Sequence, residues 1–182
     1  DLRAISCGIT TVLAAARVSA ERKGVLGSWS GDGIRLAQEY ERFLDRTKAR
    51  HLIHVRWDTA MADAQPALEA LSRLRSIGNL VYNENVPGER QYRDLEALIR
   101  HQAERMRISM EKSRELMEER IREARAVNNR ALVKQALAGK VPIGSHDDTL
   151  VEHVLEAHEF GATLAEMPVT IEAARKAKEL GM

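Results

Sequence analysis

The sequence predicts an α/β protein of the (β/α) TIM-barrel-like type, in which parallel strands alternate with helices. Apolar runs of strand length recur along the chain, and a stretch with apolar residues at helical spacing follows each of them. Polar side chains stand where several of these runs end. Because strands connected through helices pair in parallel, their carboxyl ends would converge on one mouth, where barrels build their active sites.

The expected elements follow one another in a regular order. Strands are expected at 9–15, 51–58, 79–85, 141–145 and 162–167. Helices are expected at 34–49, 62–77, 95–138, 149–160 and 170–180. An open doubly wound sheet would show the same alternation. No strand is followed by a G-x-G-x-x-G phosphate-binding turn, which favours the barrel over the dinucleotide-binding form of that sheet.

The third helical stretch, 95–138, is the longest and the most charged, and a break is expected near 127–129. It carries an apolar stripe typical of a packing face. The residues of this stripe are Met106, Met110, Met117 and Ile121. We interpret 1–182 as the central part of one barrel domain and 95–138 as a helical excursion within it. The excursion is either an exposed helical pair packed on the barrel, the more common case, or a lid or a contact in a homo-oligomer.

Composition restricts the class of protein and of partner. The 28 basic and 27 acidic residues nearly cancel, and they are interleaved in the charged stretch, so nucleic acid is not expected as a partner. No apolar run approaches the roughly 20 residues that span a bilayer, so no membrane is expected either. The single cysteine, Cys7, cannot form an intramolecular disulfide, which is consistent with a reducing compartment. A cytoplasmic location follows as the expectation.

Alternation within the strand 51–58 puts His54, Arg56 and Asp58 on one face. A polar face is unusual in a parallel sheet, whose strands are normally buried on both sides. If this face points into a barrel, an arginine and an aspartate stand in its interior. An edge strand with one solvated face, or a buried Arg56–Asp58 ion pair without a function, explains the same pattern equally well.

The sequence SHDD places His146, Asp147 and Asp148 where a strand should end and a helix begin. These side chains can bind a metal or transfer a proton. The structural alternative is a helix start, because Thr149 and Glu152 have the spacing of a capping box. We interpret the segment as both, with His146 turned into the mouth while Thr149 caps the helix behind it.

Four segments carry a resemblance to a known family. They read GITTVLAA, HLIHVRWD, PGERQYRDLE and SHDDTLVEHVLEAHEFGATLAEMPVTIEAARKAKELGM. In this order they resemble stretches of the PhnM-type phosphonate-metabolism enzymes of the amidohydrolase superfamily, the alpha-D-ribose 1-methylphosphonate 5-triphosphate diphosphatases. The resemblance spans nearly the whole chain, and its most specific parts are SHDDT and AEMPVTIEAA.

The resemblance implies a metal-dependent hydrolase on an eight-stranded barrel, with zinc or manganese as cofactor and a phosphorylated sugar as small-molecule partner. In the family, a divalent ion activates a water that attacks a phosphoanhydride, and pyrophosphate is released. By position, His146 is a metal ligand, and Asp58 stands where the family has a bridging glutamate. Asn85 stands in place of a histidine ligand. Asp147 and Asp148 would be the catalytic residues that orient the ligand or the water.

The same carry-over assigns contacts to the substrate. Gly88, Gln91 and Arg93 match the family's PGQRQFRD-like turn, where arginines suit a substrate that bears several phosphates. Arg56 would face the phosphates from its strand. Glu166, which matches a strand end of the family, would contact the substrate or support the residues that do.

The departures at Asp58 and Asn85 keep other functions open, because a shorter carboxylate could lose the bridging position and an amide is a poor ligand for zinc. One alternative is a degenerate barrel relative without a metal, with a binding or structural role. Another is an amidohydrolase that acts on a different substrate. The chain opens without a methionine and lacks the family's first-strand and last-strand metal motifs. We therefore expect a fragment of a longer protein that is inactive in isolation.

Overall fold

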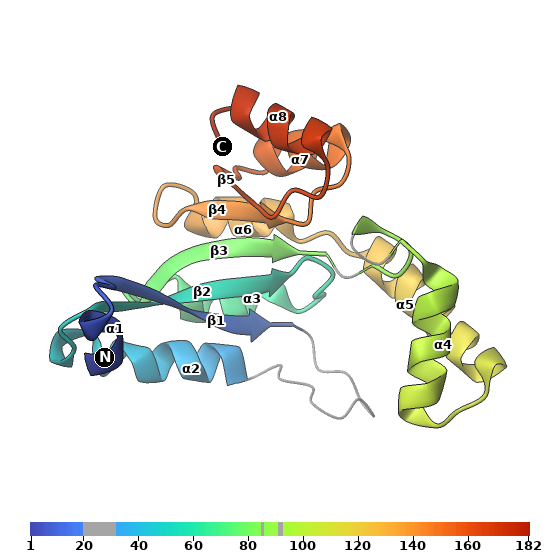
Figure 1. Cartoon of the computed structure of the whole chain (residues 1–182), viewed down its shortest axis with the longest axis horizontal. Coiled ribbons are helices and arrows are strands. Elements are labelled where there is room, and N and C mark those ends of the chain that lie inside the picture. Colours follow the sequence, from blue (N-terminus) through green and yellow to red (C-terminus); the bar gives the residue numbers. More distant parts are fainter. Residues whose placement is uncertain (20–31, 85, 91–92) are drawn as a thin grey trace.

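A computed structural model describes residues 1–19, 32–84, 86–90 and 93–182 of the chain (Figure 1). Its centre is a sheet of five parallel strands, whose spatial order β1-β2-β3-β4-β5 is also their order along the chain. The strands are β1 (Thr11–Val18), β2 (Arg50–Asp58), β3 (Ile77–Asn83), β4 (Ile143–His146) and β5 (Leu164–Glu166). The predicted α/β fold with parallel strand pairing is confirmed, and this sheet is compatible with a barrel.

A helix follows every strand, as the alternating pattern predicts. The helices are α1 (Leu2–Ser6), α2 (Asp32–Glu41), α3 (Ala64–Leu71), α4 (Leu95–Met106), α5 (Met110–Ala126), α6 (Arg130–Leu137), α7 (Val151–Glu159) and α8 (Ile171–Glu179), with a short 3-10 helix η1 (Leu44–Arg46) before β2. None of the helices in the described ranges is long and apolar enough to cross a membrane.

Every strand has a bound that differs from the prediction by one to three residues, and β1 and β3 show the cause. β1 covers 11–18 instead of 9–15, because its pairing with β2 continues through the partners Arg17–Arg56 and Val18–Trp57. β3 covers 77–83 instead of 79–85. In both cases the neighbouring strand sets the bounds, whereas the prediction followed the apolar run. Strand propensity depends on such neighbours, and a polar residue such as Arg17 ends an apolar run without ending a strand.

One face of the sheet packs against helices and forms the core. Val55 and Trp57 of β2 are fully buried there, together with side chains of α2, α3, α6 and α7. Asn129, buried just before α6, accepts the Trp57 Nε1–H at 2.8 Å and donates to the backbone oxygens of Asp58 and Met61 at 3.1 and 2.9 Å. These hydrogen bonds hold the carboxyl end of β2 against the helix layer.

The other face of the sheet carries polar residues, and we call it the open face. It is defined by Arg17, His54, Arg56, Asn79, Asn83, His146 and Glu166. These positions alternate with the core positions along each strand, as side chains of a strand must. Leu13 and Leu164 on this face are 49% and 39% exposed. In the part of the chain that the structure describes, solvent therefore reaches this face.

The stretch 95–138 contains three helices and two breaks. The predicted break separates α5 from α6, and a second lies after α4, where Arg107 has a left-handed backbone with φ of 54°. Ser113 of α5 donates to the Ile99 backbone oxygen of α4 at 2.7 Å, which joins the two helices. Figure 1 shows this pair extending beyond the carboxyl end of the strands. Of the predicted apolar stripe, Met117 is buried, whereas Met106 and Met110 are exposed.

Candidate functional site

Three side chains from different strands meet on the open face. Glu166 Oε2 lies 3.6 Å from His54 Nε2 and 3.6 Å from His146 Nε2. The same carboxylate oxygen is buried and has no hydrogen-bond partner in the structure. A buried carboxylate oxygen normally has a donor, since leaving it without one costs free energy. The three groups therefore form a polar site in which one buried carboxylate oxygen is left without a hydrogen-bond donor from the described residues.

The contact between His54 and Glu166 also reports the shape of the sheet. β2 and β5 are separated by β3 and β4, so in a flat sheet their backbones would lie about 14 Å apart. Side chains that stand on a flat sheet point in parallel directions and would not converge over that distance. The sheet must curl toward the open face, which is the direction in which a barrel closes.

His146 is oriented by the residue that follows it. Its Nδ1 lies 2.6 Å from Asp147 Oδ2, and its Nε2 lies on the side of Glu166. Asp147 has a left-handed backbone with φ of 58°, which aspartate tolerates better than most residues. Its N–H donates to the Glu166 backbone oxygen at 3.0 Å. A carboxylate beside one ring nitrogen is a common partner of a metal-bound or proton-transferring histidine.

The described residues do not assemble the metal site that the sequence predicts. Within the described ranges, no group of three or more histidine, cysteine, aspartate or glutamate residues could hold a metal ion. Asp58 is 6% exposed, and its Oδ1 accepts the Ala60 N–H at 3.0 Å. Asn85, the third expected ligand, lies outside the described residues.

Asp148, predicted as catalytic, is placed differently from Asp147. It is 1% exposed, and its carboxylate pairs with the Arg90 guanidinium and accepts the Ser145 hydroxyl proton. The Arg90 Nη1 also donates to the backbone oxygen of His146 at 3.4 Å. Asp148 therefore supports the strand end that carries His146 through Arg90, which donates to the His146 backbone oxygen.

Asp148 belongs to a buried network that the sequence reasoning missed. Arg90 Nη2 lies 2.8 Å from Glu84 Oε2, and the other oxygen of Glu84 pairs with Arg130. Arg130 also lies over the Tyr82 ring, 5.8 Å from its centroid. Burial lowers the pKa of Arg130 and raises the pKa of Tyr82, while the Arg130 charge partly offsets the effect on Tyr82. We define the buried network as Glu84, Arg90, Arg130 and Asp148.

The predicted substrate contacts are only partly brought together. Arg56 donates from Nη2 to Asn83 Oδ1 at 2.9 Å on the open face. Gly88 is exposed in a turn with φ of 86°, a left-handed conformation that favours glycine. Arg93 is exposed. Gln91 lies outside the described residues.

The predicted capping box at the start of α7 is wrong. The N-cap is Leu150, and the Thr149 hydroxyl donates to the Asp147 backbone oxygen at 3.1 Å. His153 takes the capping role, because its Nδ1 accepts the N–H groups of Thr149 and Leu150 at 3.3 and 3.4 Å. Burial, followed by the Arg90 charge, lowers the pKa of His153. A histidine three residues into a helix gives no recognised capping signal, so the hydroxyl and carboxylate pattern misled the prediction.

His54 is the site residue whose role the sequence analysis left unassigned. Its signal was present, since it alternates with Arg56 and Asp58 on the polar face of β2. Arg90 and Arg130 had no such signal. Their partners lie up to 58 residues away in the chain, as in the Arg90–Asp148 pair, and only the fold brings them together.

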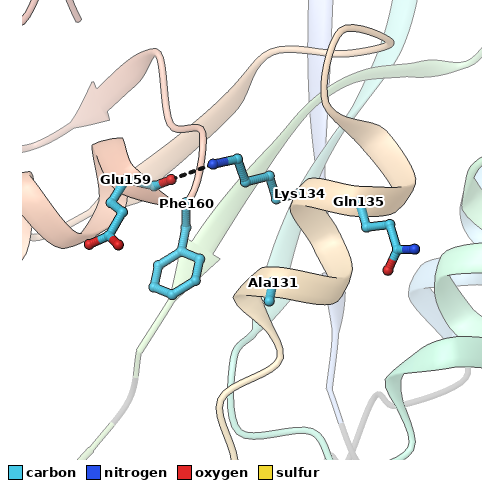
Figure 2. Close-up of a pocket in the computed structure, with 5 residues that line it drawn as sticks. All are labelled: Ala131, Lys134, Gln135, Glu159 and Phe160. Atoms are coloured by element: carbon cyan, nitrogen blue, oxygen red, sulfur yellow. Dashed lines mark hydrogen bonds between the residues drawn. The ribbon is translucent and has the colours of Figure 1, made fainter.

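A separate pocket of about 450 Å³ lies on the helix layer (Figure 2). It is lined by Ala131, Lys134, Gln135, Glu159 and Phe160. Lys134 Nζ donates to the Glu159 backbone oxygen at 2.7 Å, so its charge already serves the end of α7. None of the predicted site residues lines this pocket, and we do not assign it to the candidate site.

Comparison with known proteins gives one relative. The chain is 26% identical over 191 aligned positions to the alpha-D-ribose 1-methylphosphonate 5-triphosphate diphosphatase of Escherichia coli (strain K12). The alignment covers 100% of this chain and 49% of that protein, so the chain spans about half the length of the curated relative it matches. No protein-family model and no solved structure matches the chain. The similarity supports a distant relationship to that diphosphatase.

Proposed function

We propose that this chain is part of a hydrolase that cleaves a phosphoanhydride in a ribose phosphonate triphosphate and releases pyrophosphate. The observation that carries the proposal is the meeting of His54, His146 and Glu166 on the open face, in a chain similar along its whole length to a diphosphatase. In the reaction, water adds to a phosphorus atom, the bond between the first and second phosphates breaks, and the leaving oxygen is protonated.

His146 is the best candidate to accept the proton of the water. Its Nδ1 lies 2.6 Å from Asp147 Oδ2, which leaves Nε2 facing the open site. A carboxylate behind the imidazole also stabilises the positive charge that forms when the ring takes up a proton. Glu166 would position His146 and His54 relative to the substrate. Arg56 would bind a phosphate through its guanidinium.

A divalent ion, zinc or manganese, is part of the proposal as a prediction. When bound at such a site, it would supply a water of lowered pKa and positive charge beside the phosphates. The described residues offer imidazole and carboxylate donors of the right kind, although no group of three among them could hold the ion. A complete set would therefore need ligands beyond those described, since His146 Nε2 cannot both bind the ion and accept the proton of the water.

The first experiment compares the full-length protein that contains this chain, as the wild type, with its His146→Ala variant. We expect pyrophosphate release from alpha-D-ribose 1-methylphosphonate 5-triphosphate to fall by about 10²- to 10⁴-fold, the usual contribution of a general base. Metal content, measured by elemental analysis, should stay at the wild-type level, because a base and a metal ligand cannot share one nitrogen; a parallel fall would make His146 a metal ligand instead of the base, as the resemblance implies. The exposed His158 of α7 provides the matched control, and His158→Ala should leave both quantities unchanged. Absence of pyrophosphate release from the wild type would contradict the proposal.

A second candidate is a barrel relative with a binding role and no catalysis. The observation that favours it is the absence of a three-residue metal cluster among the described residues, with Asp148 held by Arg90 and Ser145. The same experiment decides between the two. Stoichiometric binding of the substrate without pyrophosphate release, and without metal, would support the binding protein.

A further inference from the structure

Two arginines stand side by side on the open face. Arg17 of β1 and Arg56 of β2 are direct partners in the parallel pairing of these strands, so their backbones lie about 4.8 Å apart and both side chains leave the same face. Like charges placed directly opposite each other in a sheet are destabilising. Within the described residues, neither guanidinium makes an ion pair with a carboxylate, and the one hydrogen bond of the pair joins Arg56 to the Asn83 side-chain oxygen at 2.9 Å.

The Asn83 amide gives a second, independent observation. Asn83 is 5% exposed, and its Nδ2 is buried without a hydrogen-bond partner among the residues that the structure describes. Its Oδ1 already accepts from Arg56, so the missing partner of Nδ2 must be an acceptor. A buried donor without an acceptor costs about 1 to 3 kcal/mol. The cluster therefore contains two positive charges and one unsatisfied donor, a combination that an anionic acceptor would satisfy.

The arginines of the buried network differ from Arg17 and Arg56, because they do have carboxylate partners. Arg90 and Arg130, which share Glu84, the residue after Asn83, each contact at least one carboxylate. Arg17 is exposed and Arg56 is half-buried, so a ligand can approach them from the solvent side. A phosphate group fits such a cluster, because the planar fork of arginine matches two phosphate oxygens and an amide nitrogen can donate to a third.

We propose that Arg17, Arg56 and Asn83 form a subsite for the phosphate groups of the ligand, at the carboxyl ends of β1, β2 and β3. The ligand class is a polyphosphate or phosphate ester. This inference rests on the proposed function for the identity of the whole substrate, but phosphate binding itself does not depend on hydrolysis. Arg17, which no other observation singled out, becomes a binding residue.

The test measures the affinity of inorganic pyrophosphate by titration calorimetry, at fixed low ionic strength and with a chelator present so that no metal mediates binding. We expect Arg17→Gln and Arg56→Gln each to weaken binding about tenfold, since a charge-assisted hydrogen bond is lost. Arg56→Lys keeps the charge but loses the fork, so its affinity should fall between those of the wild type and Arg56→Gln. Arg100→Gln, at an exposed position of α4, is the matched control and should bind as the wild type does.

Thermal unfolding shows whether a variant that binds more weakly is still folded. Arg17 is exposed, and its removal relieves repulsion, so Arg17→Gln should unfold at the wild-type temperature or slightly above it in the absence of anions. Pyrophosphate should raise the unfolding temperature of the wild type more than that of the variant. Equal pyrophosphate affinity in all four variants and the wild type, or no binding by the wild type, overturns the subsite.

The outcomes for this subsite and for the proposed hydrolase can be told apart. If the protein releases pyrophosphate from the triphosphate and Arg17→Gln leaves KM unchanged, the hydrolase stands and the subsite is wrong. If the variants weaken pyrophosphate binding but no hydrolysis occurs, the subsite stands and the hydrolase is wrong.

Discussion

Two groups of charged residues lie at the carboxyl end of the same sheet, and they differ in how fully their partners satisfy them. In the buried network, Arg90 and Arg130 share Glu84, and Arg90 also pairs with Asp148. On the open face, Arg17 and Arg56 lack such carboxylates within the described residues, and the Glu166 Oε2 and Asn83 Nδ2 atoms have no partner. Charges that are neutralised inside the protein hold structure, whereas charges left unsatisfied at an accessible face are available to a ligand.

The largest expected effect comes from opening the buried network. Asp148→Ala leaves Arg90 as a buried cation without one of its two carboxylates, so we expect the free energy of unfolding to fall by about 3 to 5 kcal/mol. Urea denaturation followed by circular dichroism measures this. If the loss is well below 1 kcal/mol, the network does not hold the structure and the contrast with the open face fails.

A smaller effect is expected from acid, through His153. Its pKa is lowered in the folded protein, so the unfolded chain takes up this proton at higher pH than the folded chain. The contribution of His153 to stability is therefore complete above about pH 6.5 and is lost as the pH falls below it. Denaturation of wild type and His153→Gln at pH 7.5 and pH 5 checks this. The stability difference between the two proteins should shrink at pH 5, and a constant difference would contradict the capping role.

On the open face, substitution should change ligand binding more than stability. Glu166→Gln removes a carboxylate whose Oε2 accepts no hydrogen bond, and its side chain is 34% exposed. We expect the free energy of unfolding to change by about 1 kcal/mol or less. Denaturation of this variant beside Asp148→Ala compares the two regions directly, and similar losses in both would remove the distinction between them.

The smallest effect is expected for an ion pair on the helical excursion. Arg114 of α5 pairs with Glu96 of α4 at 2.6 Å, with both side chains about half exposed. Solvent screens such a pair, so Arg114→Gln should leave the urea midpoint unchanged. A clear loss of stability would mean that solvent exposure is not what separates these charges from the buried network.

The order of the elements was predictable from the sequence because apolar spacing and helix signals are local. The strands and helices follow one another in the predicted order, although α2 and α3 end at Glu41 and Leu71, well before the predicted ends at 49 and 77. The polar face of β2 was also predictable from the alternation of His54, Arg56 and Asp58. The errors have a shared cause, since strand bounds and caps depend on neighbours in space. The end of β1 is set by Arg56 and Trp57 of β2, and the cap of α7 is set by the side chain of His153.

The candidate site could be predicted only as a set of positions. The sequence indicated His146 and Asp147, which are adjacent, but the mutual distance of His54, His146 and Glu166 follows from the curl of the sheet. The different partners of the two aspartates, His146 for Asp147 and Arg90 for Asp148, were not predictable either. It depends on which carboxylate meets Arg90, a residue 58 positions from Asp148 in the chain.

The identity of strand order in space with strand order along the chain has a consequence for folding. Each strand pairs with the one made immediately before it, so every new strand finds its partner already present as the chain leaves the ribosome. Most strand contacts close loops of a few tens of residues, apart from β3 and β4, which the charged helices separate. Loop closure of this kind favours rapid folding, and growth in one direction leaves one strand edge at a time exposed to misassembly. We therefore expect β1, β2 and β3 to form a protected unit before β4 joins, and pulsed hydrogen exchange during refolding can observe that order.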